Sequence, residues 1–166
     1  MGRPAMKHRH EHPIPIMTKK LESTLVGVAG EYLVAGELTL RGHIASITLR
    51  NSRGMDIIAS NADASKSISI QVKTNSDGHA KWILTQKSEH FYSSNHFYVM
   101  VALKPLGHRP DFYIVPSQVV ADYIANRHAA WLKGKKVGGA SRKDSAIRNF
   151  IDLDGKYREA WYLLSI

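Results

Sequence analysis

The fold is decided by residues 54–73, which read GMDIIASNADASKSISIQVK. The stretch 67–73 alternates between apolar and polar residues, the pattern of a strand with one buried face. Its apolar side chains are those of Ile68, Ile70 and Val72, and its polar side chains are those of Ser69, Gln71 and Lys73. Residues 55–60 predict a preceding strand, and the polar residues 61–66 predict the connection between the two.

Upstream of this stretch, the sequence predicts a helix over about 21–40 and a strand over 43–49. Apolar residues recur at three- and four-residue spacings through the helix, which indicates a buried stripe. Arg41 and Gly42 are expected to end the helix, since glycine favours the position just after a helix. Residues 51–54 predict a turn. One helix followed by three strands is therefore expected over 21–73.

Downstream, alternating elements are expected to complete a mixed sheet. The expected elements are a short extended piece at 81–84, a short helix at 88–93, strands at 97–103 and 111–115, a helix starting at 116–117 and a loop at 133–145. Ser117 is a candidate N-cap because its hydroxyl can accept a free backbone N–H. Residues 160–166 fit either a strand or a short helix. The order predicts an α/β or α+β sandwich around a mixed sheet.

Length and composition indicate one globular domain. The chain has 166 residues, 43% of them hydrophobic and none of them cysteine. The missing cysteine excludes disulfides, thiolate catalysis and cysteine zinc sites, and it fits a cytoplasmic protein. No apolar run approaches the roughly 20 residues that span a bilayer, and residues 1–20 do not resemble a secretory signal. We expect a disordered basic tail over 1–20 and a single domain over 21–166.

The chain carries a formal charge of +9 with a pI near 9.8, and the excess is concentrated in residues 1–20 and 127–150. Two basic patches on a near-neutral body favour a polyanionic partner, nucleic acid before a membrane surface. The alternative is a solvated basic face without a partner. The candidate phosphate contacts are Lys133, Lys135, Lys136, Arg142, Lys143 and Arg148. Trp131 is either a stacking surface for a base or a core residue.

Three residues of the central strands are candidates for chemistry. Gln71 and Lys73 are two apart on one strand, so both point to the same face. Asp56 lies on the preceding strand, and adjacent strands bring the three side chains to one place. A carboxylate and a neighbouring oxygen can hold a hard cation such as Mg²⁺, and an ammonium beside it can orient a water molecule. The pattern therefore favours metal-assisted phosphate chemistry.

These residues resemble the motifs of the PD-(D/E)XK nuclease superfamily, and the Holliday-junction-resolvase-like branch is the closest in layout. The resemblance is carried by Gly30–Glu31 on the first helix, by residues 54–56 and by residues 70–73. It covers about residues 21–103. The resemblance implies a restriction-endonuclease-like αβββαβ core with a mixed central sheet flanked by helices. Met55 stands where the family has proline, and Gln71 stands where it has an acid, although Gln-x-Lys variants occur among active members.

The resemblance also implies a role for each site residue. Asp56, Gln71 and the main-chain carbonyl of Val72 would bind Mg²⁺ or Mn²⁺, and Lys73 would orient the attacking water. Glu31 would reach the metal directly or through water and supply the charge that Gln71 lacks. The substrate implied is DNA, cut as a phosphodiester by an endonuclease. Related resolvases act as dimers, so a homodimer is expected by analogy.

Two other functions remain open from the sequence. The first is a nuclease-fold protein that has lost catalysis and only binds nucleic acid, which Gln71 favours. The second is a basic protein-interaction module, in which Asp56 and Glu31 would point away from Lys73. The tail adds a cluster of His8, His10 and His12 around Glu11 that can bind zinc or nickel, although adventitious binding explains it as well.

Overall fold

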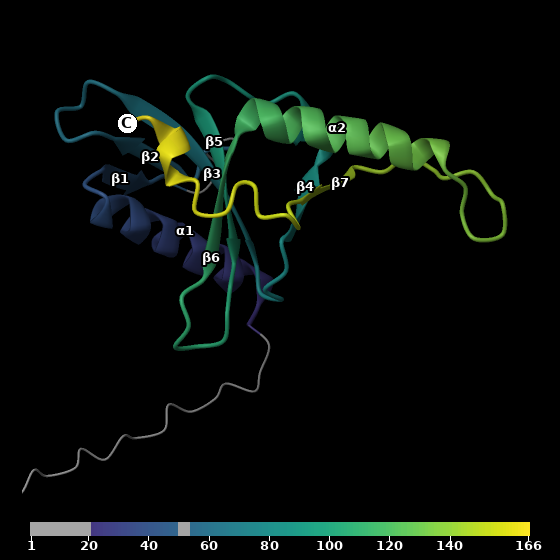
Figure 1. Cartoon of the computed structure of the whole chain (residues 1–166), viewed down its shortest axis with the longest axis horizontal. Helices are drawn as coiled ribbons and strands as arrows, with labels where there is room; N and C mark the ends of the chain where they lie inside the picture. Colours follow the sequence, from purple (N-terminus) through teal and green to yellow (C-terminus); the bar gives the residue numbers. More distant parts are fainter. Residues whose placement is uncertain (1–20, 50–53) are drawn as a thin grey trace, which may run out of the picture.

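Figure 1 shows the computed structural model of the chain, which describes residues 21–49 and 54–166. The predicted basic tail, its histidine cluster and most of the predicted turn at 51–54 lie outside the described residues. Within the described part, a five-stranded sheet has the order β1-β2-β3-β5-β6. Its strands are β1 (Ile44–Ile47), β2 (Ile57–Ser60), β3 (Ser67–Asn75), β5 (His96–Ala102) and β6 (Asp111–Pro116). Strands β3 and β5 pair in parallel and the other neighbours are antiparallel, which confirms the mixed α/β sheet.

Strand β5 separates two hydrophobic cores, because its successive side chains point to opposite faces of the sheet. Phe97, Val99 and Val101 enter the first core, and Tyr98 and Met100 enter the second. All seven residues of the strand are buried. A strand buried on both faces lies at the centre of the molecule, with a layer on each side.

The first face of the sheet is covered by helix α1 (Ser23–Leu40), as Figure 1 shows. Val34 and Leu38 of this helix are fully buried against Ile70 and Val72 of β3. Residues of the C-terminal segment, which ends in the 3₁₀-helix η2 (Trp161–Leu164), complete the same core. The predicted helix at 21–40 is confirmed, and the segment that the sequence left open is a single 3₁₀ turn.

The second face is covered only in part. Helix α2 (Ser117–Lys133) and an antiparallel ribbon of β4 (Lys81–Thr85) with β7 (Ile147–Ile151) pack on β5 and β6. The polar side chains of β3 on this face stay half-buried. The uncovered part of this sheet face therefore lies over β2 and β3.

No described helix is long and apolar enough to cross a membrane.

The connection between the parallel strands differs from the expected αβββαβ order. Residues 76–95 contain β4 and the short 3₁₀-helix η1 (Gln86–Glu89), where a helix at 88–93 was predicted. Strand β4 buries Trp82 and Leu84, and it pairs with β7, about 65 residues later in the chain. Because this partner is so distant in sequence, local periodicity gave no indication of β7.

Ser117 is not the N-cap of α2, contrary to the prediction. It is the first helical residue, and its buried hydroxyl accepts the Ser93 N–H and donates to the Ser93 carbonyl, both at 3.1 Å. These bonds satisfy a backbone segment that has no strand partner there, which explains why the hydroxyl turns away from its own helix.

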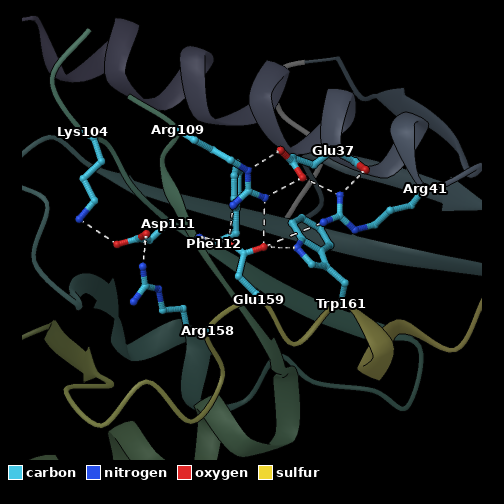
Figure 2. A network of polar contacts seen from close by, with 9 residues as sticks. All are labelled: Glu37, Arg41, Lys104, Arg109, Asp111, Phe112, Arg158, Glu159 and Trp161. Atoms are coloured by element: carbon cyan, nitrogen blue, oxygen red, sulfur yellow. Dashed lines mark hydrogen bonds and ion pairs between the residues drawn. The ribbon is translucent and has the colours of Figure 1, made fainter. Parts of the chain in front are cut away.

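A network of ion pairs joins α1 to the C-terminal segment (Figure 2). Arg109 donates to both carboxylate oxygens of Glu37 at 3.2 and 2.9 Å and to those of Glu159 at 2.7 and 3.0 Å. Arg41 pairs with Glu37 at 2.5 Å, and its guanidinium lies 4.2 Å from the centre of the Trp161 ring. A single exposed ion pair contributes about 0–1 kcal/mol to the free energy of unfolding. Here Arg109 pairs with both α1 and the C-terminal segment, so one arginine links two segments that are distant in sequence.

Gly30 allows α1 to lie close to β3. A Cβ at this position would be 1.8 Å from Thr74 Oγ1, 3.0 Å from Thr74 Cβ and 3.1 Å from Thr74 Cγ2. Rotating the threonine does not relieve the clash, since its Cβ does not move. Gly36 of the same helix has no described atom within 4 Å of such a Cβ.

We expect Gly30→Ala to destabilise the fold and Gly36→Ala to stabilise it. The first change overpacks a tight contact, which costs about 1–3 kcal/mol. The second removes a flexible glycine from an open helical site, a gain of about 0.5–1 kcal/mol. Urea unfolding of the two variants beside wild type measures both changes. Equal effects would mean that Gly30 does not set the spacing between helix and sheet.

Candidate active site

Asp56 directly precedes β2 and is bonded to β3 on one side and to the residue that follows β1 on the other. Its backbone N–H donates to the Ile70 carbonyl at 2.8 Å, and its carbonyl accepts the Thr48 N–H at 2.9 Å. Its carboxylate accepts the Val72 N–H at 2.7 Å. The Asp56 carboxylate thus takes the place that a backbone carbonyl of β2 would have opposite the Val72 N–H, and it is fixed at the edge of β3.

The Val72 carbonyl is directed to the same edge. The N–H and C=O of one β residue point to the same side of a strand, and the Val72 N–H points to Asp56. Pairing between β2 and β3 covers Ile57 opposite Ile70, so β2 ends before it reaches Val72. The Val72 carbonyl therefore points to the side of β3 on which Asp56 lies, and its role as a metal ligand remains a prediction.

Gln71 and Lys73 lie on one face of β3, opposite to the face with Ile70 and Val72. Both are half-buried. Neither the Gln71 amide nor the Lys73 ammonium makes a hydrogen bond or ion pair within 21–49 and 54–166. Half-buried polar groups without a protein partner remain available to a bound molecule.

Burial raises the pKa of the Asp56 carboxyl above its ordinary value. The Val72 N–H and the Lys73 charge act in the opposite direction and do not cancel it. The protein therefore disfavours the charged carboxylate, although it holds it in place. A cation bound at this oxygen would offset the cost of burial.

Gly54 brings the loop before Asp56 against Phe91. Its φ of +67° is in the left-handed region, and a Cβ there would be 2.7 Å from the Phe91 ring. Phe91, Met55 and His96 line a cavity of about 420 Å³, whose lining stops one residue short of Asp56. The glycine of the 54–56 motif is therefore required by local packing.

Tyr98 and His96 are two polar neighbours of this site that sequence reasoning missed. Tyr98 lies opposite Gln71 and His96 opposite Ser69 in the parallel ladder, so both share the open face. The His96 Nδ1 is 2.8 Å from the Ser69 hydroxyl. The Tyr98 hydroxyl and His96 Nε2 are buried and have no hydrogen-bond partner in the described chain.

The two groups are neutral at neutral pH. Burial lowers the pKa of His96. Burial raises the pKa of Tyr98, and the Asp56 charge raises it further. The polar hydroxyl of nearby Ser88 opposes this rise. Buried polar atoms without partners are rare and concentrate at functional sites. The alternation of β5 places them on this face, a signal hidden by the apolar composition of that strand.

Glu31 is the helix carboxylate of the predicted site. It follows Gly30 on α1 and is half-buried, and α1 covers the sheet face of Val72 and Thr74. Gln71 and Lys73 point to the other face. The role of Glu31 at the metal remains a prediction.

The donor set suits a hard cation with few protein charges. Within the described residues, no three or more histidine, aspartate or glutamate side chains gather as a metal site. The candidate ligands are the Asp56 carboxylate, the Gln71 amide oxygen and the Val72 carbonyl. Mg²⁺ is commonly held by one or two carboxylates together with substrate phosphates. These residues therefore fit a metal that binds with its substrate.

The predicted phosphate contacts in the basic loop after α2 are largely exposed, but the prediction was wrong for Arg148. Lys133, Lys135, Lys136 and Lys143 are exposed, and Arg142 is half-buried with an N–H donated to the Trp131 carbonyl at 2.7 Å. Arg148 is 3% exposed, and its guanidinium pairs with Glu89. It belongs to the buried face of β7, so it cannot follow a phosphate backbone. Figure 1 shows the loop projecting from the body at the end of α2.

The fold is similar to that of a solved nuclease. No protein-family model matches the sequence, and no curated protein matches it. Among solved structures, a bacterial homing endonuclease, I-Ssp6803I, aligns with a TM-score of 0.50 over 87% of this chain and 92% of that chain, with 16% identity. The chain has a nuclease-like fold. At this identity the likeness concerns the fold alone.

We expect Asp56→Asn to raise the free energy of unfolding at neutral pH. The folded pKa of Asp56 is raised, so the native state binds more protons than the unfolded state between the two pKa values. Wild-type stability therefore falls as pH rises through this window, and the loss persists above it. The asparagine keeps an oxygen for the Val72 N–H and removes the buried charge.

Urea unfolding from pH 3 to pH 8 measures the effect. Asp63→Asn is the control, because Asp63 is exposed and its pKa is lowered. A variant that is less stable than wild type at neutral pH would show that the surroundings of Asp56 do not disfavour its charge.

Proposed function

We propose that this chain is a metal-dependent DNA endonuclease of the PD-(D/E)XK type, with Mg²⁺ or Mn²⁺ as cofactor. The observation that carries the proposal is the bond from the Val72 N–H to the Asp56 carboxylate, which fixes that carboxylate beside Gln71 and Lys73 on an open sheet face. The nuclease-like fold and the endonuclease activity of the structural neighbour support it.

Each residue has a separate task in phosphodiester hydrolysis. Asp56, Gln71 and the Val72 carbonyl would hold the metal. When bound, a divalent metal polarises the scissile phosphate and lowers the pKa of a bound water. The Lys73 ammonium, which has no ion-pair partner closer than 4 Å in the described chain, would orient that water and offset charge that develops on the phosphate. The exposed lysines of the basic loop would hold the phosphate backbone.

Gln71 favours a second candidate, a nuclease-fold protein that binds nucleic acid without cutting. A neutral amide in place of a carboxylate leaves Asp56 as the single acidic ligand on this face. The Lys73 charge opposes the rise in the pKa of Asp56, so the two groups are close enough to interact. A protein-interaction module would instead have Asp56 pointing away from Lys73. The homodimer remains a prediction.

Lys73→Ala should reduce cleavage about 100-fold or more, because it removes the group that offsets developing charge. The measurement is cutting of labelled branched, duplex and single-stranded DNA with Mg²⁺ or Mn²⁺, and its EDTA control tests metal dependence. Lys87→Ala, an exposed lysine on η1, loses the same charge and should cut as wild type does. Binding without cutting by wild type on every substrate would favour the inactive nucleic-acid binder.

Gln71→Glu should bind Mn²⁺ about tenfold more tightly than wild type, because a second carboxylate adds charge beside Asp56. Titration calorimetry with the metal alone measures this without reference to activity. Gln86→Glu adds the same charge at an exposed position on η1 and serves as control. An unchanged dissociation constant in Gln71→Glu would exclude Gln71 from the metal site.

A further inference from the structure

A second cavity lies between α2 and the β4–β7 ribbon, and its volume of about 870 Å³ is in the range of ligand-binding sites. Its lining comes from the second half of α2, from β7 and the residues before it, and from the start of β4. Figure 1 shows α2 and β7 side by side, with the basic loop extending beyond both. The proposed nuclease chemistry does not use this cavity.

The lining is apolar on its floor and cationic at its rim. The apolar side chains are those of Tyr123, Ile124 and Ala130 of α2 and of Ile147 at the start of β7, and Lys81 and Arg127 supply positive charge. The lining contains no aspartate or glutamate. Within the described residues, Lys81 and Arg127 make no ion pair, whereas the charge of Arg148 is matched by Glu89.

The aromatic wall of the cavity is fixed from behind. The Trp131 ring stacks on His128 with centroids 5.4 Å apart and an interplanar angle of 24°. The guanidinium of Arg142 lies 5.0 Å from the Trp131 centroid, and His128 Nε2 is 2.6 Å from Asp144 Oδ1. Trp131 nevertheless remains 42% exposed. An exposed tryptophan that is held in one orientation loses little entropy when a ligand contacts it.

We propose that this cavity binds one nucleotide unit of a single-stranded nucleic acid. The planar base would lie on the apolar floor beside Trp131, and the phosphate would meet Arg127 and Lys81. A flat apolar surface with cations at its edge suits a base and its phosphate together. The exposed lysines of the loop at 133–143 continue the positive surface away from the cavity. The inference rests on the proposal that this chain acts on nucleic acid, and it names a strand-binding site apart from Asp56.

The test is binding of a labelled thymidine oligonucleotide in EDTA, followed by fluorescence anisotropy at several salt concentrations. Arg127→Ala and Trp131→Ala should each weaken binding about tenfold. Arg127→Ala should also lower the salt dependence by about one phosphate contact. The matched controls are Arg158→Ala and Lys104→Ala, whose cations pair with Asp111 away from the cavity (Figure 2). Lys81→Ala should weaken binding, and Lys104→Ala should not.

A second readout uses the exposure of the tryptophans. Of the three tryptophans, Trp82 is 2% exposed, Trp161 is half-buried and Trp131 is 42% exposed, so iodide quenching is strongest at Trp131, and Trp131→Phe gives the background from the other two. The oligonucleotide should protect this fluorescence, and the protection should disappear in Trp131→Phe. Equal affinity of the Arg127, Lys81 and control variants would overturn the proposal. Protection by polyglutamate but not by the oligonucleotide would also overturn it, since the cavity would then accept an acidic polypeptide.

The two proposals fail separately. Binding that depends on Arg127, without cutting under any metal, supports the nucleotide cavity and removes the nuclease. Metal-dependent cutting by wild type, with Arg127→Ala and the controls binding alike, supports the nuclease and removes the cavity.

Discussion

The hydrogen bond from the Val72 N–H to the Asp56 carboxylate is the interaction on which the site depends. At this point a side chain takes the place of a backbone carbonyl, so the ladder between β2 and β3 ends while its last residue stays attached. Three consequences follow from this one bond. The carboxylate is fixed without a salt bridge, the Val72 carbonyl is left at an open edge, and the polar face of β3 begins next to it. The glycine at 54 and its contact with Phe91 shape the approach to this point.

The open face exists because the two layers of the molecule are unequal. Helix α1 covers the first face of β3, whereas α2 and the β4–β7 ribbon cover β5 and β6 on the second. Gln71 and Lys73 therefore stay half-buried beside a fully buried Tyr98. Charges at such a boundary interact more strongly than at an exposed surface, yet they remain accessible to a ligand. A sheet covered equally on both faces would have buried these groups or excluded them.

Much of this site was predictable from local pattern. The two-residue period of 67–73 placed Gln71 and Lys73 on one face, and strand order brought Asp56 beside them. The sequence predicted β4 as a short extended piece at 81–84, but it did not predict β7 or the pairing of the two strands, which are about 65 residues apart. Arg148 was wrongly predicted to contact phosphate, because the sequence of a short basic stretch does not show that one of its cations pairs with Glu89. His96 and Tyr98 were missed because β5 is apolar enough to conceal two polar side chains.

The energetic balance of the site argues for a ligand. The fold buries a carboxylate at a cost, and within the described residues the Tyr98 hydroxyl and His96 Nε2 are buried without a hydrogen bond. A scaffold under selection for stability alone gains nothing from these groups, and apolar residues of similar shape would serve it better. A bound cation and phosphate would offset the carboxylate and the Lys73 ammonium together. With Gln71 in place of an acid, β2 and β3 supply one negative charge, so the substrate phosphate or Glu31 would have to supply the rest. Metal and substrate binding should therefore be strongly coupled, more so than at a site with two carboxylates.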